Sequence, residues 1–203
     1  MAWMKSFVVA VLLLGGRGPI RAADFMFDGA GYAFGWEGKE GSGSIKEYFT
    51  GDEKPETWQT LITVTCHPEA VKLADVTGPY FEARKAIVAM PPTAHRTPGS
   101  EGATDVVLEL FLGAPGRTPH LEYVLARFIA TDPGVHSIVY SRKFPFTGKG
   151  DQKVDVDAAI KNSTRWIREL QNVPVESVRR CFLPADAVQA AGAEAARASP
   201  GAP

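Results

Sequence analysis

The chain has 203 residues, with 22 Lys and Arg against 23 Asp and Glu, which gives a formal net charge of −1 at pH 7. This length is typical of one domain, since domains commonly hold roughly 100 to 200 residues. The sequence contains no cluster of basic side chains. General nucleic-acid binding is therefore excluded, because it depends on grouped Lys and Arg that neutralise phosphates.

The first 23 residues have the three parts of a secretory signal peptide. Lys5 gives a basic start, residues 7–14 are apolar, and Ala22 and Ala23 are small residues beside the expected cleavage site. The apolar run is shorter than the roughly 20 residues of a membrane-spanning helix. We predict cleavage after Ala23, with a cut after Ala22 or near Gly16 as alternatives. A buried N-terminal strand or an uncleaved anchor are the other interpretations of this segment.

Removal of this segment leaves 19 basic and 23 acidic residues, a net charge of about −4. The predicted mature chain is periplasmic or secreted and has no transmembrane segment. In such an oxidising compartment, a disulfide between Cys66 and Cys181 would close a long loop, worth about 4 to 5 kcal/mol in the chain-entropy model. Two buried free thiols are the alternative, and sequence separation does not decide between them.

Glycine and aromatic residues alternate in the first predicted strand, where Tyr32, Phe34 and Trp36 fall at a spacing of two. Two is the period of a strand, so we expect all three rings on one face. Residues 44–50 and 58–66 are rich in β-branched and aromatic side chains and predict two further strands. The Gly and Ser residues before residue 44 predict a hairpin turn.

Residues 69–90 have a helical composition that Gly78 and Pro79 interrupt, which predicts a broken or two-part helix. Residues 91–103 predict a polar loop. Three strands should follow as a meander, because segments rich in Gly and Pro separate three runs with strand periodicity. These runs are residues 105–112, 120–130 and 135–144.

Asp155 is expected to cap a second helix from Val156 to about Gln171, since its carboxylate can accept from amides of the first turn. Residues 178–183 predict a short last strand or extended chain. The whole pattern predicts an α+β domain over residues 24–183, with an antiparallel sheet of about five to seven strands and two helical segments packed on it. Residues 184–203 predict an Ala-rich flexible tail.

Catalytic residues, metal ligands and cofactors are not predicted, because the sequence contains no zinc spacing, nucleophile elbow, phosphate loop or dinucleotide fingerprint. Cys66 and His67 are neighbours on a strand and point to opposite faces, so they do not form a dyad with each other. An enzyme would need a site assembled from distant residues, with Cys66, His120, His136 and Asp105 as candidates.

Aromatic residues concentrate in the first three predicted strands. A ligand-binding wall is one use for them, since aromatic side chains on a sheet supply large contact areas. Core filling is the commoner use. The candidate ligand-binding residues are Tyr32, Phe34, Trp36, Tyr48 and Trp58.

Residues 43–64 place Glu47, Tyr48 and Phe49 near the end of one predicted strand, and Trp58 shortly before a Thr-Val strand. This run resembles a pattern found in small uncharacterised exported bacterial proteins, with a layout similar to the PsbP-like sandwich. The resemblance implies a periplasmic or secreted α+β domain and brings no catalytic residues with it.

The absence of any convergent catalytic motif favours a non-enzymatic function. We expect an exported protein that binds a small ligand or a protein partner at the cell envelope. A hydrolase-type enzyme with a site around Cys66 and a structural component of the envelope are the alternatives.

Overall fold

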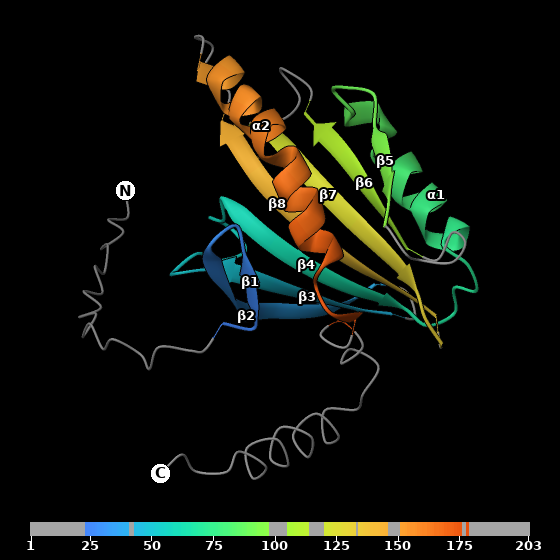
Figure 1. Cartoon of the computed structure of the whole chain (residues 1–203). Coiled ribbons are helices and arrows are strands. Elements are labelled where there is room, and N and C mark those ends of the chain that lie inside the picture. Colours follow the sequence, from blue (N-terminus) through green and yellow to red (C-terminus); the bar gives the residue numbers. More distant parts are fainter. Residues whose placement is uncertain are drawn as a thin grey trace, which may run out of the picture.

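The computed structural model describes residues 23–40, 43–97, 105–113, 120–132, 134–145, 151–175 and 178. Within this part of the chain, eight strands form one antiparallel sheet in the order β1-β2-β3-β4-β8-β7-β6-β5. The sheet curls into a half-barrel, and the longer of two helices crosses it (Figure 1). The strands are β1 (Phe25–Phe27), β2 (Ala30–Glu40), β3 (Gly43–Thr50), β4 (Thr60–His67), β5 (Thr93–Arg96), β6 (Asp105–Leu112), β7 (His120–Ala130) and β8 (Val135–Pro145). The helices are α1 (Ala74–Glu82), the short 3₁₀ helix η1 (Lys85–Ile87) and α2 (Asp151–Gln171).

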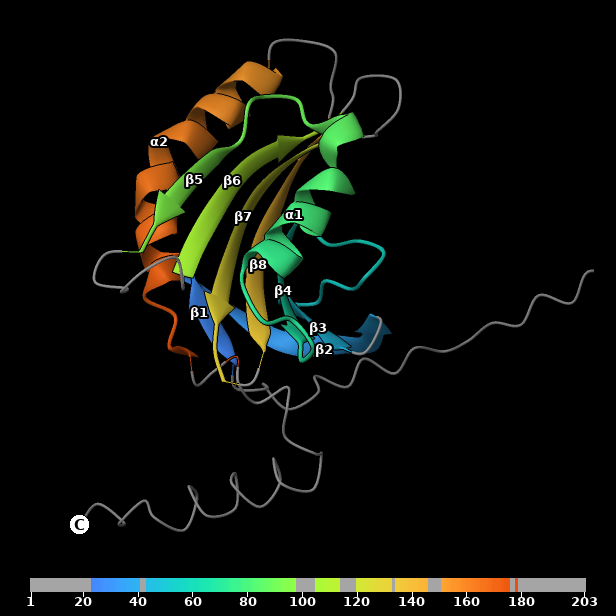
Figure 2. The same ribbon diagram turned by 90° about the vertical axis from the view of Figure 1, so that its right-hand side faces the viewer.

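The two helices lie on opposite faces of the sheet, as Figure 2 shows. Successive residues of β7 belong to different cores, because side chains alternate between the faces of a strand. Tyr123 and Leu125 pack with Trp166 and Leu170 of α2. Val124 and Ala126 pack in a second core with Val76 of α1. We call these surfaces the α2 face and the α1 face.

The sheet wraps around α2, since both of its edges reach this helix. At one edge, the backbone N–H of Asp28 donates to Glu169 Oε1 at 2.8 Å, and the Asp28 carboxylate pairs with Arg165. At the other edge, Gln171 Nε2 donates to the carbonyl of Arg96 on β5 at 3.2 Å. These contacts hold both edges of the sheet to α2.

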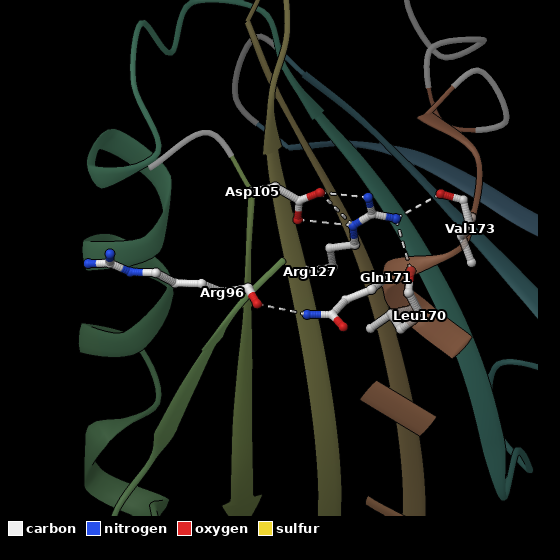
Figure 3. Close-up of polar contacts among 6 residues, drawn as sticks. All are labelled: Arg96, Asp105, Arg127, Leu170, Gln171 and Val173. Carbon is white, nitrogen blue, oxygen red and sulfur yellow. Dashed lines mark hydrogen bonds and ion pairs between the residues drawn. The ribbon is translucent and has the colours of Figure 1, made fainter. Parts of the chain in front are cut away.

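A buried ion pair ties the C-terminal end of α2 to the sheet (Figure 3). The Arg127 side chain on β7 is only 4% exposed, and its Nη2 lies 2.6 Å from Asp105 Oδ2 on β6. Its Nη1 donates to the carbonyls of Leu170 at 2.9 Å and Val173 at 2.7 Å. Carbonyls in the last turn of a helix lack partners within it, and a cation there is favoured by the helix dipole. Arg127 therefore acts as the C-terminal cap of α2.

The predicted α+β class with about five to seven strands is wrong. The described chain is mostly an eight-stranded antiparallel half-barrel with few helices. The six long strands lie close to their expected positions, but the short edge strands β1 and β5 were missed. β5 lies within the predicted polar loop, because four largely exposed residues carry no apolar periodicity.

The predictions for the helices also need correction. The two helices do not cover one common face of the sheet, because α1 packs against β6 and β7 on the face opposite α2. α1 passes through Gly78 and Pro79 and ends at Glu82, since the helical bond from Ala83 N to Pro79 O continues the turn. α2 begins at Asp151, so Asp155 lies inside the helix and is not its N-cap.

The other expectations for the chain ends lie outside the described residues. These include the predicted signal peptide over residues 1–23 except Ala23, the predicted strand or extended chain over 178–183 except Val178, and the predicted tail over 184–203. Cys181 also lies outside them, so its disulfide with Cys66 stays a prediction. Of the described helices, neither is both long and apolar enough to cross a bilayer.

Candidate ligand groove

A groove of about 680 Å³ lies between α1 and the α1 face of the sheet. Strands β3, β4, β7 and β8 form its floor, and one side of α1 forms its wall. Ligand pockets commonly measure roughly 300 to 1,000 Å³, so the groove is large enough for a small organic molecule.

Hydroxyl side chains occupy the centre of the floor. Thr65 of β4 and Ser137 of β8 are direct cross-strand partners, and Thr63 and Ser141 lie on the same face of the same two strands. Two central strands covered by a helix would ordinarily present large apolar side chains here. The small hydroxyl residues leave space under α1 and supply hydrogen-bonding groups.

Apolar and aromatic contacts hold α1 above this floor. Val76 is buried in the core of the α1 face, and the Tyr80 ring meets Phe128 edge-on with centroids 5.1 Å apart. The Arg84 guanidinium stacks on the Tyr80 ring, with its central carbon 3.7 Å from the ring centroid. Asp75 Oδ2 accepts from the backbone N–H groups of Val71 and Lys72, each at 3.0 Å, which fixes the start of α1. The wall of the groove is thereby anchored at both ends.

Glu47 places a carboxylate in the groove on the β3 side. Its neighbours across the sheet are Thr63 on β4 and Trp36 on β2. The Glu47 side chain is half-buried and makes no hydrogen bond or ion pair with any other described residue. Burial raises the pKa of this carboxyl group above its ordinary value, because a carboxylate loses hydration there.

A β-bulge at Gly35 brings Trp36 to the α1 face. Phe34 pairs with Tyr48, whereas Trp36 pairs with Glu47, so Gly35 is the extra residue between them. A Cβ at Gly35 would lie 2.4 Å from the Phe49 ring, which leaves room for glycine alone. The prediction that all three rings of β2 share one face is therefore wrong.

A family model matches residues 22–175 of the chain, a span that includes every described strand and both the floor and the wall of the groove. The chain belongs to this family. The family is uncharacterised, and it therefore assigns no activity to the groove. No curated protein and no solved structure matches the chain.

In this family member, the five predicted ligand-binding residues are dispersed. Tyr32 is buried in the core of the α2 face, where Phe34 and Tyr48 meet edge-on at 5.9 Å. Trp58 stacks under Lys143, whose Nζ lies 3.4 Å from the ring centroid. None of these five residues lines the groove, but Trp36 is the cross-strand partner of Glu47, which does.

The candidates for an assembled catalytic site are also separated. Cys66 Sγ lies 3.5 Å from His136 Nδ1, but the two residues are 1% and 0% exposed. Asp105 pairs with Arg127, and His120 lies at the start of β7, where burial and Lys143 lower its pKa. The structure thus brings together Cys66 and His136 alone among these candidates, at a place that a substrate does not reach.

Sequence reasoning missed the residues that form the groove. The sequence did contain a signal: Thr63 and Thr65 occupy alternate positions of one strand, and Ser137 and Ser141 lie four residues apart on one face of another, with Val139 between them. Such a run of small hydroxyl residues on one face of adjacent central strands indicates a surface that is not filled by a hydrophobic core. The pairing of the two strands, however, is visible only in the fold.

Proposed function

We propose that the protein is an exported, non-enzymatic binding protein that holds a small ligand in the groove between α1 and the sheet. The observation that carries this proposal is the groove of about 680 Å³ between the sheet and α1, a helix that is anchored at both ends. Apolar walls with a few polar groups at fixed positions are the usual composition of ligand sites. Here Leu61, Val124 and Val139 supply apolar surface between the hydroxyl groups of the floor.

The enzyme alternative has weaker support. A nucleophile must meet its substrate within hydrogen-bonding reach of a base, and Cys66 and His136 are both sealed in the interior. A purely structural role in the envelope would leave the groove without a use. Both alternatives give results different from ligand binding in the experiment below.

Export to the periplasm or the medium is part of the proposal. It is supported by the signal-like composition of residues 1–23 and by a family match that begins at residue 22. The similarity in layout to PsbP-like proteins stays an expectation. N-terminal sequencing of protein from the native host tests the export, and peptide mapping without reductant tests the bond between Cys66 and Cys181. An intact N-terminus on cytosolic protein would contradict this part of the proposal.

The groove is tested by filling it. Thr63→Phe places a ring in the middle of the floor, and Thr93→Phe makes the same change on the exposed edge strand β5. Native mass spectrometry and thermal-shift measurements with a panel of small amines, sugars, carboxylic acids and lipids should find ligands of the wild type. We expect Thr93→Phe to keep this binding and Thr63→Phe to lose it, with both variants folded by circular dichroism. A panel without any ligand, or full binding by Thr63→Phe, would refute the groove as the site.

A further inference from the structure

An aromatic residue and an acidic residue are cross-strand neighbours on the α1 face. Trp36 on β2 pairs with Glu47 on β3, and Glu47 pairs with Thr63 on β4. Direct cross-strand neighbours on one face have Cβ atoms roughly 4.5 to 5.5 Å apart. The side chains of Trp36, Glu47 and Thr63 therefore leave the sheet next to one another and on the same side.

Glu47 differs from the other acidic residues of the groove. Asp75 already accepts two backbone N–H groups, and Glu122 is the cross-strand partner of Lys143. Glu47 has no such compensation among the described residues and is half-buried. An unpaired carboxylate that has lost part of its hydration is costly to keep in a fold, and a cationic partner removes that cost.

Trp36 offers an aromatic surface on the same face of the sheet as this carboxylate. The residue is 42% exposed, although it is one of the largest apolar residues of the chain. The six-membered part of its ring lies over Gly38, where a Cβ would come within 2.4 Å of it. Glycine thus allows the ring to lie against β2, with the remainder of its surface toward solvent. The bulge at Gly35 determines that this surface is on the groove side.

We infer that the ligand of the groove is a small organic cation whose ammonium group binds between the Trp36 ring and the Glu47 carboxylate. This inference rests on the proposed function and gives it a ligand class. An aromatic face attracts an ammonium group through its quadrupole, and tryptophan is the strongest of the aromatic side chains in this respect. The carboxylate adds the opposite charge, and the rest of the molecule extends over the hydroxyl floor toward α1.

The test compares cations with neutral molecules of the same shape. Choline and 3,3-dimethylbutan-1-ol differ in the charged nitrogen alone, and 1,4-diaminobutane and 1,4-butanediol form a second pair. Calorimetry on the full chain should show binding of the cations about tenfold or more tighter than that of their neutral partners.

Two variants and two matched controls locate the effect. Glu47→Gln and Trp36→Leu should each weaken cation binding about tenfold and leave the binding of neutral probes unchanged. Glu37→Gln changes an exposed glutamate of β2 that faces Lys46, and Trp58→Leu removes a tryptophan that stacks on Lys143. Both controls should bind cations like the wild type.

The outcomes separate the inference from the proposal on which it rests. Equal binding of cations and neutral partners, or unchanged cation binding by Glu47→Gln, would overturn the inference. If neutral probes then bind and Thr63→Phe blocks them, the groove remains the ligand site with another ligand class. If neither kind of probe binds and the wider panel also fails, both are refuted.

Discussion

The two faces of the sheet are built from different kinds of residue. The α2 face is closed by interlocking rings, such as Tyr123, Tyr140 and Trp166, and by the buried pair of Arg127 and Asp105. The α1 face is covered by one short helix and leaves hydroxyl groups and a carboxylate along an open groove. The comparison indicates that stability is concentrated on the α2 face, which frees the α1 face to carry a site.

The largest expected effect concerns Arg127. Arg127→Leu leaves Asp105 buried without a partner and removes the cap of α2, so we expect a loss of about 3 to 5 kcal/mol in the free energy of unfolding. Urea denaturation followed by circular dichroism measures this loss. Lys46→Leu, which removes the exposed pair with Glu37, is the control and should change stability by less than about 1 kcal/mol. Equal losses of stability in the two variants would contradict the stabilising role of the buried pair of Arg127 and Asp105.

A matched pair of leucines tests the asymmetry of the two cores. Leu170 of α2 is completely buried, and Leu73, directly before α1, is nearly so. We expect Leu170→Ala to cost about 2 to 5 kcal/mol and Leu73→Ala to cost less, since chain beside an open groove can relax into the space. The same denaturation experiment compares them. A larger loss for Leu73→Ala would reverse our assignment of the stabilising face.

Two glycines should respond to alanine with opposite signs. At Gly35 a methyl group would collide with Phe49, so Gly35→Ala should destabilise the bulge by about 1 to 3 kcal/mol. At Gly78 nothing lies within 4 Å of the added Cβ, and Gly78→Ala should stabilise α1 by about 0.5 to 1 kcal/mol. Melting temperatures of both variants give the signs. Stabilisation by Gly35→Ala would contradict the close packing that fixes Trp36.

The smallest expected effect is the pH dependence of Glu47. Burial raises the pKa of Glu47 in the folded state above its value in the unfolded chain. Its ionisation therefore reduces stability as the pH rises through the ordinary pKa of glutamate toward the raised one. Without ligand, Glu47→Gln should be more stable than the wild type at neutral pH, and the difference should vanish in acid.

Melting curves over a pH series measure the effect of Glu47, with Glu37→Gln as the control. Other titratable or charged groups lining the groove are His67, Asp75, Arg84 and Glu122, and all of them remain in both variants. Their contributions therefore cancel in the comparison. A stability difference independent of pH would show that the carboxylate is not responsible.

The positions of the long strands could be predicted from the sequence, whereas the groove and its residues could not. Long strands such as β7 and β8 were predicted because alternation over many residues is a strong signal, whereas the three residues of β1 carry too little. Gly35 looked like one more member of a regular alternation, and only its pairing with β3 identifies the bulge. Glu47 was noted in the run of residues 43–64. That its carboxylate lacks a charged partner among the described residues could not be predicted, because this depends on the strands that pair with β3.

The most direct test of the account is a crystal structure of the protein with choline. We predict electron density for the trimethylammonium group over the Trp36 ring and beside the Glu47 carboxylate, with the remainder of the molecule under α1. Choline bound elsewhere, while the groove between α1 and the sheet stays empty, would contradict the assignment of this face as a cation site.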